Sequence, residues 1–307
     1  MKLSGKIVFS SGKIGKYDIF KLNLDAGRVD QLTMGDSVNS CPKWSPDGKK
    51  IVFISDRSGT PEIWVMADGG SEETRLTAEN RWHNTPDWSP DGKHLVFCAN
   101  YDGNIDVYMM NVDGTNRQQI TNYPEMDYAP QFSPDGKTIV FVSKRGGQPG
   151  IWICDLSSKA LRRLSNEGDR DYAPRYSPDR TKIAFVRGVI TEHGKEKFWI
   201  ALMDPDGKNQ QEFPTSRGCD RYVGWSPDGD ALIYTTGEFF DSAQRLMVLD
   251  LRAQAVSQVK FDRRVLENGI ASRPQGLWFF RLLPEKMLRR FYPQSYFGNE
   301  RSPDWKA

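Results

Sequence analysis

A five-residue motif, Trp-Ser-Pro-Asp-Gly or a close variant of it, recurs along this 307-residue chain at an almost constant interval. Its copies are Trp44-Ser45-Pro46-Asp47-Gly48, Trp88-Ser89-Pro90-Asp91-Gly92, Phe132-Ser133-Pro134-Asp135-Gly136, Tyr176-Ser177-Pro178-Asp179-Arg180 and Trp225-Ser226-Pro227-Asp228-Gly229. The first four copies lie 44 residues apart, and the fifth follows after 49. Repeats of about 40–45 residues are typical of the four-stranded blades of a β-propeller. The period therefore constrains the fold more than any other feature of the chain.

Each repeat contains four short segments with strand character, separated by turn residues. In the unit over residues 40–77, the expected strands are 41–44, 51–54, 63–66 and 74–77. The middle two are rich in β-branched and aromatic residues, which favour strands. Pro, Asp, Ser and Gly dominate the connections between them. The same pattern returns in the following units, which predicts blades that pack through matched aromatic side chains.

The first unit lacks its first strand, because the chain opens directly with the apolar segment 7–9. The missing piece reappears near the C-terminus, where Ser302-Pro303-Asp304-Trp305 resembles Thr85-Pro86-Asp87-Trp88. A ring that borrows a C-terminal strand leaves no open sheet edges. We therefore predict that residues 302–305 complete the first blade.

The number of blades follows from the count of units. Five full units and one shared unit predict an all-β, six-bladed β-propeller of four-stranded antiparallel blades, forming a single domain over residues 1–307. Residues 261–301 are then an elaborated C-terminal segment before the closing strand. The alternative is a degenerate seventh blade built on the apolar run 277–283, although this segment contains no Ser-Pro-Asp-Gly.

These units resemble the TolB-type repeats of the WD-repeat-like β-propellers, which also occur in the propeller domains of tricorn proteases and prolyl oligopeptidases. The resemblance covers about residues 5–260 and the last few residues. It departs from the pattern at Arg180, which replaces the turn glycine, and in the insertion over 187–197. The resemblance implies a propeller fold and a role in binding a protein or peptide. The proteases carry their catalysis in other domains, for which these 307 residues leave no room.

Charge and hydropathy exclude several classes of protein. The net charge is only +2, from 42 basic and 40 acidic residues, so no overall field attracts nucleic acid or an anionic membrane. No apolar run is long enough to span a membrane, and the N-terminus has no apolar signal core. We expect a cytoplasmic monomer, or a periplasmic protein if a leader preceded this sequence. The four cysteines occupy different positions in their repeats and indicate no disulfide framework.

Candidate site residues lie just before the innermost strand of each blade, where the chain rings the mouth of the central channel. The residues five positions before each motif aromatic form a mostly acidic ring: Asn39, His83, Asp127, Asp171, Asp220 and, through the closure, Glu300. The residues four positions before it are Ser40, Asn84, Tyr128, Tyr172, Arg221 and Arg301.

Two interpretations of this ring stay open. Converging carboxylates would favour a cation, a basic side chain or a peptide end, and would raise one another's pKa values. Alternatively, Asp and Asn before a strand are ordinary turn chemistry. The Asp of each Ser-Pro-Asp-Gly motif belongs to a turn on the opposite face, and we expect it to be structural.

The sequence offers little support for catalysis. The three histidines, His83, His94 and His193, show no zinc-ligand spacing, and no Gly-x-Ser-x-Gly motif is present. We therefore expect a non-catalytic propeller that binds a protein or peptide at the channel mouth and needs no cofactor. One alternative is a lyase or hydrolase that uses the ring carboxylates, with a divalent cation in the channel. Another is a module whose function comes from a neighbouring chain.

Overall fold

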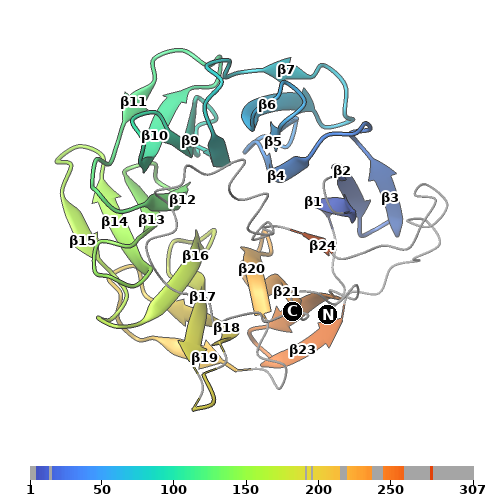
Figure 1. The fold of residues 1–307 in the computed structure, drawn as a ribbon. Coiled ribbons are helices and arrows are strands. Elements are labelled where there is room, and N and C mark those ends of the chain that lie inside the picture. The colour runs from blue at the N-terminus through green and yellow to red at the C-terminus, as the bar shows by residue number, and fades with distance from the viewer. Residues whose placement is uncertain are drawn as a thin grey trace, which may run out of the picture.

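The computed structural model of the chain describes residues 5–13, 16–190, 192–194, 196–214, 220–236, 245–258 and 277–278. All the regular structure in these ranges is β-strand, arranged as six four-stranded sheets. The sheets surround a common axis as blades, as Figure 1 shows. This arrangement confirms the predicted six-bladed β-propeller. Within the same ranges, no helix is long and apolar enough to cross a membrane.

The strands of each blade run in order from the axis outward. The first three blades are β24 (Leu277–Trp278), β1 (Lys6–Lys13), β2 (Lys16–Asn23) and β3 (Arg28–Gln31); β4 (Asn39–Trp44), β5 (Lys50–Ser55), β6 (Glu62–Ala67) and β7 (Thr74–Arg75); and β8 (His83–Trp88), β9 (His94–Asn100), β10 (Ile105–Asn111) and β11 (Gln118–Gln119). The next three are β12 (Asp127–Phe132), β13 (Thr138–Ser143), β14 (Gly150–Asp155) and β15 (Leu161–Arg163); β16 (Arg170–Tyr176), β17 (Ile183–Ile190), β18 (Glu196–Met203) and β19 (Gln211–Phe213); and β20 (Asp220–Trp225), β21 (Ala231–Thr236), β22 (Arg245–Asp250) and β23 (Ala255–Gln258).

The ring closes where β24, from the C-terminal part of the chain, completes the N-terminal blade. In the antiparallel pairing of β24 with β1, Trp278 lies opposite Ser10 and Leu277 opposite Ser11. We expected residues 302–305 in this position; they lie outside the described residues, and it is residues 277–278 that pair with β1. The start of the 277–283 run therefore belongs to the first blade rather than to a seventh.

The hydrophobic core lies between the blades. Six buried clusters each join two neighbouring blades, and the equivalent residues Phe53, Phe97, Phe141 and Phe185 are completely buried. The cluster between the last and first blades packs Phe9 against residues of β22 such as Val248. Side-chain packing therefore closes the ring in addition to the pairing of β24.

The Ser-Pro-Asp-Gly motif forms the turn from the first to the second strand. In the second blade, Ser45 Oγ donates a hydrogen bond to Asp47 Oδ1 at 2.6 Å, and the same oxygen accepts one from the backbone N–H of Lys49 at 3.1 Å. The same serine-to-aspartate bond occurs in the other four copies. Gly48 and its counterpart Arg180 both have a φ of 69°. The motif is a turn device, and the arginine adopts the backbone that glycine adopts elsewhere.

Each inner strand that carries the motif contains a β-bulge. The residue three positions before the aromatic has a left-handed backbone with φ between 48° and 56°: Cys41, Thr85, Ala129, Ala173 and Tyr222. The register with the second strand shifts at this residue. In a regular strand, residues three apart face opposite sides. The extra residue of a bulge places them on the same side, so the bulge determines which side chains of the inner strand share a face.

Candidate functional site

The predicted acidic ring is buried rather than exposed at the channel. Asn39, His83, Asp127 and Asp220 begin their inner strands, and Asp171 is the second residue of β16. Four of these side chains are 0% exposed, and Asn39 is 1% exposed. They share a face of the strand with the buried residue three positions later, as the bulge requires. Their contribution to ligand binding stays a prediction.

Two of the ring carboxylates have arginine partners in their own blade. Arg145 Nη2 donates to Asp127 at 2.6 Å, and the Arg145 guanidinium also stacks over the ring of Trp152. Arg187 makes two hydrogen bonds to Asp171, both of 2.9 Å. These bonds and the charge of Asp171 outweigh burial and raise the pKa of Arg187. Both carboxylates are therefore neutralised within the protein.

The ring residues also contact the preceding blade. Asp18, at the start of the third strand of the first blade, accepts hydrogen bonds from Asn39 Nδ2 at 3.3 Å and from Thr33 Oγ1 at 3.0 Å. At the next boundary, Glu62 Oε2 lies 3.1 Å from His83 Nδ1. Burial acts to raise the pKa of Glu62, but hydrogen bonds, first that from His83, outweigh it and lower this pKa. We call these contacts, and the equivalent one at the next boundary, the inter-blade links.

The third inter-blade link brings two carboxylates together. Asp106 accepts a hydrogen bond from Thr121 at 3.2 Å, and its charge interacts with that of Asp127 in the next blade. Burial, followed by the charge of Asp127, raises the pKa of Asp106 to about 6. Burial also raises the pKa of Asp127, although Arg145 opposes the effect. The link therefore contains a carboxyl group that titrates near neutral pH.

The residues four positions before the motif aromatic are less buried than the acidic ring. Ser40, Asn84, Tyr128 and Tyr172 are all partly exposed. Arg221 lies in β20 with its side chain outside the described part of the structure, and Glu300 and Arg301 are not among the described residues. Among the described residues, the predicted site residues that keep some exposed surface are thus polar and aromatic rather than acidic.

A second set on the same face was not among the predicted site residues. Lys43, Asp87, Gln131 and Arg175 directly precede the motif aromatic, and all are partly exposed. Lys43 and Arg175 come from the second and fifth blades, on opposite sides of the ring, yet their charges interact with each other and with Asp87. Burial and the charge of Arg175 lower the pKa of Lys43 to about 8. The charge of Arg175 therefore acts on Lys43 from the opposite side of the ring.

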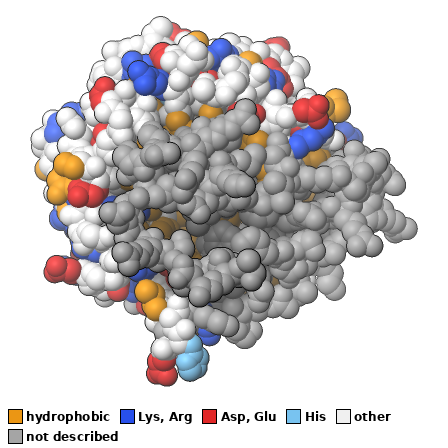
Figure 2. Space-filling view, viewed as in Figure 1, with side chains coloured by type: hydrophobic (Ala, Val, Ile, Leu, Met, Phe, Trp, Pro, Cys, Tyr) orange, Lys and Arg blue, Asp and Glu red, His pale blue; other side chains and the backbone are white. Residues whose placement is uncertain are grey.

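The sequence contained a signal for this second set. The position before each aromatic changes from Lys to Asp, Gln, Arg and Gly, while the motif after it is nearly constant. On the face of the molecule drawn in Figure 2, basic and acidic side chains are interspersed around the rim. The charge of the residue before the aromatic therefore varies from blade to blade, although this residue has no role in the turn.

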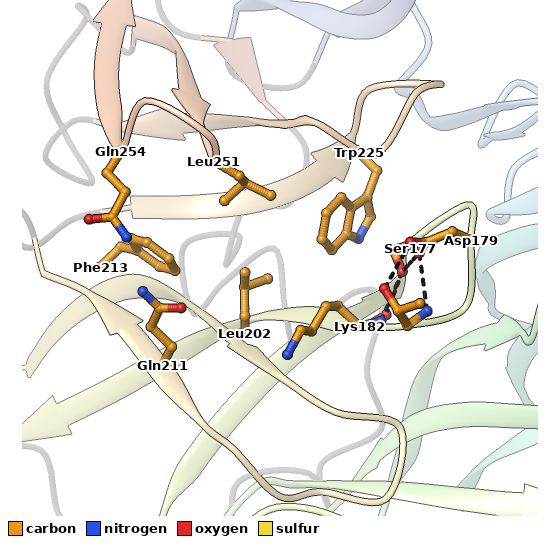
Figure 3. Close-up of a pocket in the computed structure, with 11 residues that line it drawn as sticks. Ser177, Asp179, Lys182, Leu202, Gln211, Phe213, Trp225, Leu251 and Gln254 are labelled. Atoms are coloured by element: carbon orange, nitrogen blue, oxygen red, sulfur yellow. Dashed lines mark hydrogen bonds between the residues drawn. The ribbon is translucent and has the colours of Figure 1, made fainter.

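A pocket of about 200 Å³ opens between the fifth and sixth blades, on the face of the Ser-Pro-Asp-Gly turns. Figure 3 shows Leu202, Phe213, Trp225 and Leu251 along an apolar slot, with Gln211 and Gln254 at one end and Lys182 and the turn of Ser177 and Asp179 at the other. Lys182 Nζ donates to Asp204 at 2.6 Å, so its charge is already paired. The slot could receive a small apolar group, but it lies at the opposite end of the blades from the predicted mouth.

One group among the described residues has the composition of a metal site. Glu62, Glu79 and His83 offer ligand atoms that lie within 4.8 Å of one another, at the boundary of the second and third blades. Both ring nitrogens of His83 already have partners, because Nδ1 lies 2.8 Å from the carbonyl oxygen of Arg81 and Nε2 lies 2.7 Å from Tyr101 Oη. A cation would have to replace these contacts. Sequence spacing did not reveal the group, because the fold brings its members together from different strands and loops.

Comparison with known proteins identifies the family. The TolB beta propeller domain matches residues 4–99 and 80–267. The chain belongs to the TolB β-propeller family. The repeat that defines its blades is therefore the TolB-type repeat, as its motif indicated. No curated protein matches the chain in sequence.

Solved structures show the same fold in proteins of different function. TolB from Acinetobacter baumannii is 24% identical, with a TM-score of 0.72 over 85% of this chain, which spans 65% of that TolB chain. A chain of a nidogen/laminin complex is 12% identical, with a TM-score of 0.65 and coverage of 85% of this chain and 95% of that one. An oligogalacturonate lyase from Vibrio parahaemolyticus is 16% identical, with a TM-score of 0.54 and coverage of 85% and 73%. A TolB-family propeller is compatible with binding, and its fold alone does not specify a reaction.

Proposed function

We propose that this TolB-family propeller is a non-catalytic binding module that recognises a protein or peptide partner at the channel mouth. The observation that carries the proposal is the partial exposure of polar and aromatic side chains, Tyr128 and Tyr172 among them, near the start of the inner strands. Tyrosine is enriched in the energetically dominant part of protein interfaces. The likeness to TolB and to a chain of a nidogen/laminin complex supports a protein partner.

The predicted site residues divide into two roles in this proposal. Those that contact the partner are Tyr128, Tyr172, Arg221 and Arg301. Those that shape the mouth through the blade boundaries are Asn39, His83, Asp127, Asp171, Asp220 and Glu300. For the described side chains the division follows from burial, since a side chain with no exposed surface cannot touch a partner unless the blades separate. Arg221, Arg301 and Glu300 are assigned by their position four or five residues before the motif aromatic.

Affinity capture tests the proposal. We expect the native protein and the exposed control Val256→Ala to capture a partner that Tyr128→Ala and the double variant Tyr128→Ala, Tyr172→Ala lose. The melting temperature of each variant shows whether it is folded. The double variant loses the Tyr172–Phe198 ring contact and could be destabilised by that loss, whereas the single variant Tyr128→Ala keeps this contact. Equal capture by folded Tyr128→Ala would contradict the proposal.

The alternative is a lyase or hydrolase that uses the carboxylates near the mouth. The likeness to oligogalacturonate lyase and the near-neutral pKa of Asp106 favour it. Metal analysis of the purified protein, with melting temperatures measured with and without a chelator, separates the two functions. A stoichiometric divalent metal whose removal lowers the melting temperature would favour the enzyme.

A further inference from the structure

We propose that the pocket between the fifth and sixth blades binds a small neutral aromatic molecule that carries one hydrogen-bonding group, of the size of a phenol or an indole. The pocket opens on the face of the Ser-Pro-Asp-Gly turns, whereas the partner of the proposed function is expected at the opposite mouth. The inference therefore goes beyond that function and does not depend on it.

The apolar walls of the pocket come from both blades. Leu202 of β18 and Phe213 of β19 line it from the fifth blade. Trp225 of β20 and Leu251, which follows β22, line it from the sixth (Figure 3). Leu202 is buried, whereas Phe213, Trp225 and Leu251 are partly exposed. An apolar ligand that covers these side chains would gain free energy, and the two rings among them favour another aromatic ring.

The pocket exists because the two blades approach each other less closely than others do. In the fifth blade, the hairpin between the third and fourth strands lies so near the fourth blade that a Cβ atom on Gly207 would be 2.4 Å from the carbonyl oxygen of Leu164. The corresponding hairpin of the sixth blade contains Gln254 and no glycine. Phe213 follows Leu164 by 49 residues, the spacing of the motif at this boundary, and takes its place in the fifth blade. Gln254 and Phe213 both line the pocket.

The charged side chains that line the pocket are already paired within the protein. Lys182 Nζ donates to Asp204 Oδ1 at 2.6 Å. Asp179 Oδ1 accepts hydrogen bonds from Ser177 Oγ at 2.6 Å and from the backbone N–H of Thr181 at 3.1 Å. A charged ligand would lose its hydration here without gaining an opposite charge. Charge complementarity therefore favours a neutral occupant.

Two side-chain amides can form hydrogen bonds with that occupant. Gln211 and Gln254 lie at one end of the pocket, and among the described residues neither amide has a hydrogen-bond partner. Each amide offers both a donor and an acceptor. The indole N–H of Trp225 is occupied, because it donates to the carbonyl oxygen of Arg175 at 2.9 Å. A hydroxyl or a ring N–H on an otherwise apolar ligand would thus be recognised by the glutamines.

The volume of the pocket limits the size of the ligand. It is about 200 Å³, and an engineered apolar cavity of about 150 Å³ in another protein binds benzene. One aromatic ring, or two fused rings, would therefore fill it. The glutamines bound one end and the turn that contains Ser177 and Asp179 bounds the other (Figure 3), which suits a short free molecule rather than a length of polypeptide.

Ligand-observed NMR titration of the purified protein with p-cresol tests the proposal. We expect a dissociation constant of about 1 mM or lower for the native protein, as burial of one ring implies. Leu251→Trp should bind at least about tenfold more weakly, because the larger side chain occupies the pocket. The matched control is Leu156→Trp, which should bind like the native protein. Leu156 follows Asp155 in the hairpin of the fourth blade as Leu251 follows Asp250, and both leucines are partly exposed.

The double variant Gln211→Ala, Gln254→Ala tests the hydrogen bond and remains informative if Leu251→Trp fails to fold. Both glutamines are exposed, so we expect the fold to survive their replacement. The affinity for p-cresol should fall by about two- to tenfold, the net worth of one hydrogen bond. The affinity for toluene, which lacks the hydroxyl, should stay the same. Unchanged affinity for p-cresol in this variant would overturn the assignment of the glutamines to the ligand.

Three further probes test the class of ligand. The native protein should bind p-cresol more tightly than 4-methylbenzoate, which is charged, and than 4-methylcyclohexanol, which has no aromatic ring. Equal or tighter binding of either one would overturn the assignment of a neutral aromatic ligand. N-acetyl-tyrosinamide presents the same ring as part of a polypeptide, and tighter binding of it would contradict a free molecule.

The outcomes separate this inference from the proposed function. No binding of p-cresol by the folded native protein, or equal binding by folded Leu251→Trp, overturns the inference even if a partner is captured at the mouth. Binding of p-cresol that Leu251→Trp loses supports the inference even if no partner is captured.

Discussion

At the residue scale, the charged groups of this propeller divide between the blade boundaries and the axis. A buried carboxylate is tolerated only when it is paired or hydrogen-bonded. Asp127 and Asp171 satisfy this rule through Arg145 and Arg187. These acids therefore contribute to joining strands and blades.

Asp106 provides a test of the inter-blade links. The folded protein holds the proton of this carboxyl up to about pH 6, whereas the unfolded chain releases it near the ordinary pKa of 3.8. The contribution of this group to stability therefore falls as the pH rises between these values. We expect Asp106→Asn to be more stable than the native protein at pH 8 by about 1–3 kcal/mol, and the gain to vanish near pH 4.

The free energy of unfolding in urea at pH 4, 6 and 8 checks this prediction. Asn also brings an N–H donor to Asp127, so the boundary would resemble the acid–amide pair of Asp18 and Asn39. The control is Asp113→Asn on an exposed turn, where hydrogen bonds from Thr115 lower the pKa. Its effect should have the opposite sign, with stability lost at pH 8. A gain for Asp106→Asn that does not change with pH would show that the charge of Asp106 is not its source.

At the element scale, the hairpins between the third and fourth strands join neighbouring blades. A Cβ atom built on Gly70, Gly114 or Gly207 would lie 2.4–2.7 Å from a carbonyl oxygen of the preceding blade. The corresponding hairpin of the sixth blade has no glycine and contains Gln254, a residue that lines the pocket between the fifth and sixth blades. At three blade boundaries, the close contact of this hairpin with the preceding blade thus depends on a glycine.

Substitution of Gly114 by alanine should separate two blades. Its Cβ would meet the carbonyl oxygen of Leu76 at 2.5 Å, so the hairpin would have to move. Gly103 is the matched control, because its φ of 88° is close to the 85° of Gly114 while no atom lies within 4 Å of its Cβ. Both variants bear the backbone strain, and Gly114→Ala should lose about 1–3 kcal/mol more. Equal urea midpoints for the two would refute the close contact.

At the scale of the whole molecule, the ring is closed both by backbone pairing and by side-chain packing. β24 pairs with β1, and Phe9 of the first blade packs in a cluster with Val248 of the sixth. Closure buries the two sheet faces that a linear array of blades would expose. The stability of every blade therefore depends in part on a strand near the other end of the chain.

The double variant Leu277→Pro, Trp278→Pro tests the closing strand. Proline removes both backbone N–H groups of β24, so whichever of them faces β1 loses its hydrogen bond. We expect the melting temperature to fall by several degrees, at about 2–4 °C for each kcal/mol lost. Deletion of residues 302–307 leaves β24 in place and should have a smaller effect. A larger effect of the deletion would indicate that residues 302–305 are the closing strand after all.

The fold could be predicted from the sequence because its signals are local. The turn motif, the 44-residue period and the alternation of strands and turns all follow from neighbouring residues. The candidate site could be predicted only in part. Counting back from the aromatic located the start of each inner strand, but it placed buried Asp171 and partly exposed Tyr172 in one exposed ring. It also passed over Lys43 and Arg175.

The sequence by itself determined the propeller architecture, the strands within its blades and the turns that join them. The tertiary structure decided between six and seven blades, which side chains of the inner strands are buried and which segment closes the ring. The bulge residues share a left-handed backbone but no side-chain chemistry from which it could be predicted. They are Cys41, Thr85, Ala129, Ala173 and Tyr222. Strand pairing depends on the free N–H and C=O groups of a backbone edge rather than on a sequence motif. Leu277–Trp278 therefore pairs with β1 without resembling the other inner strands.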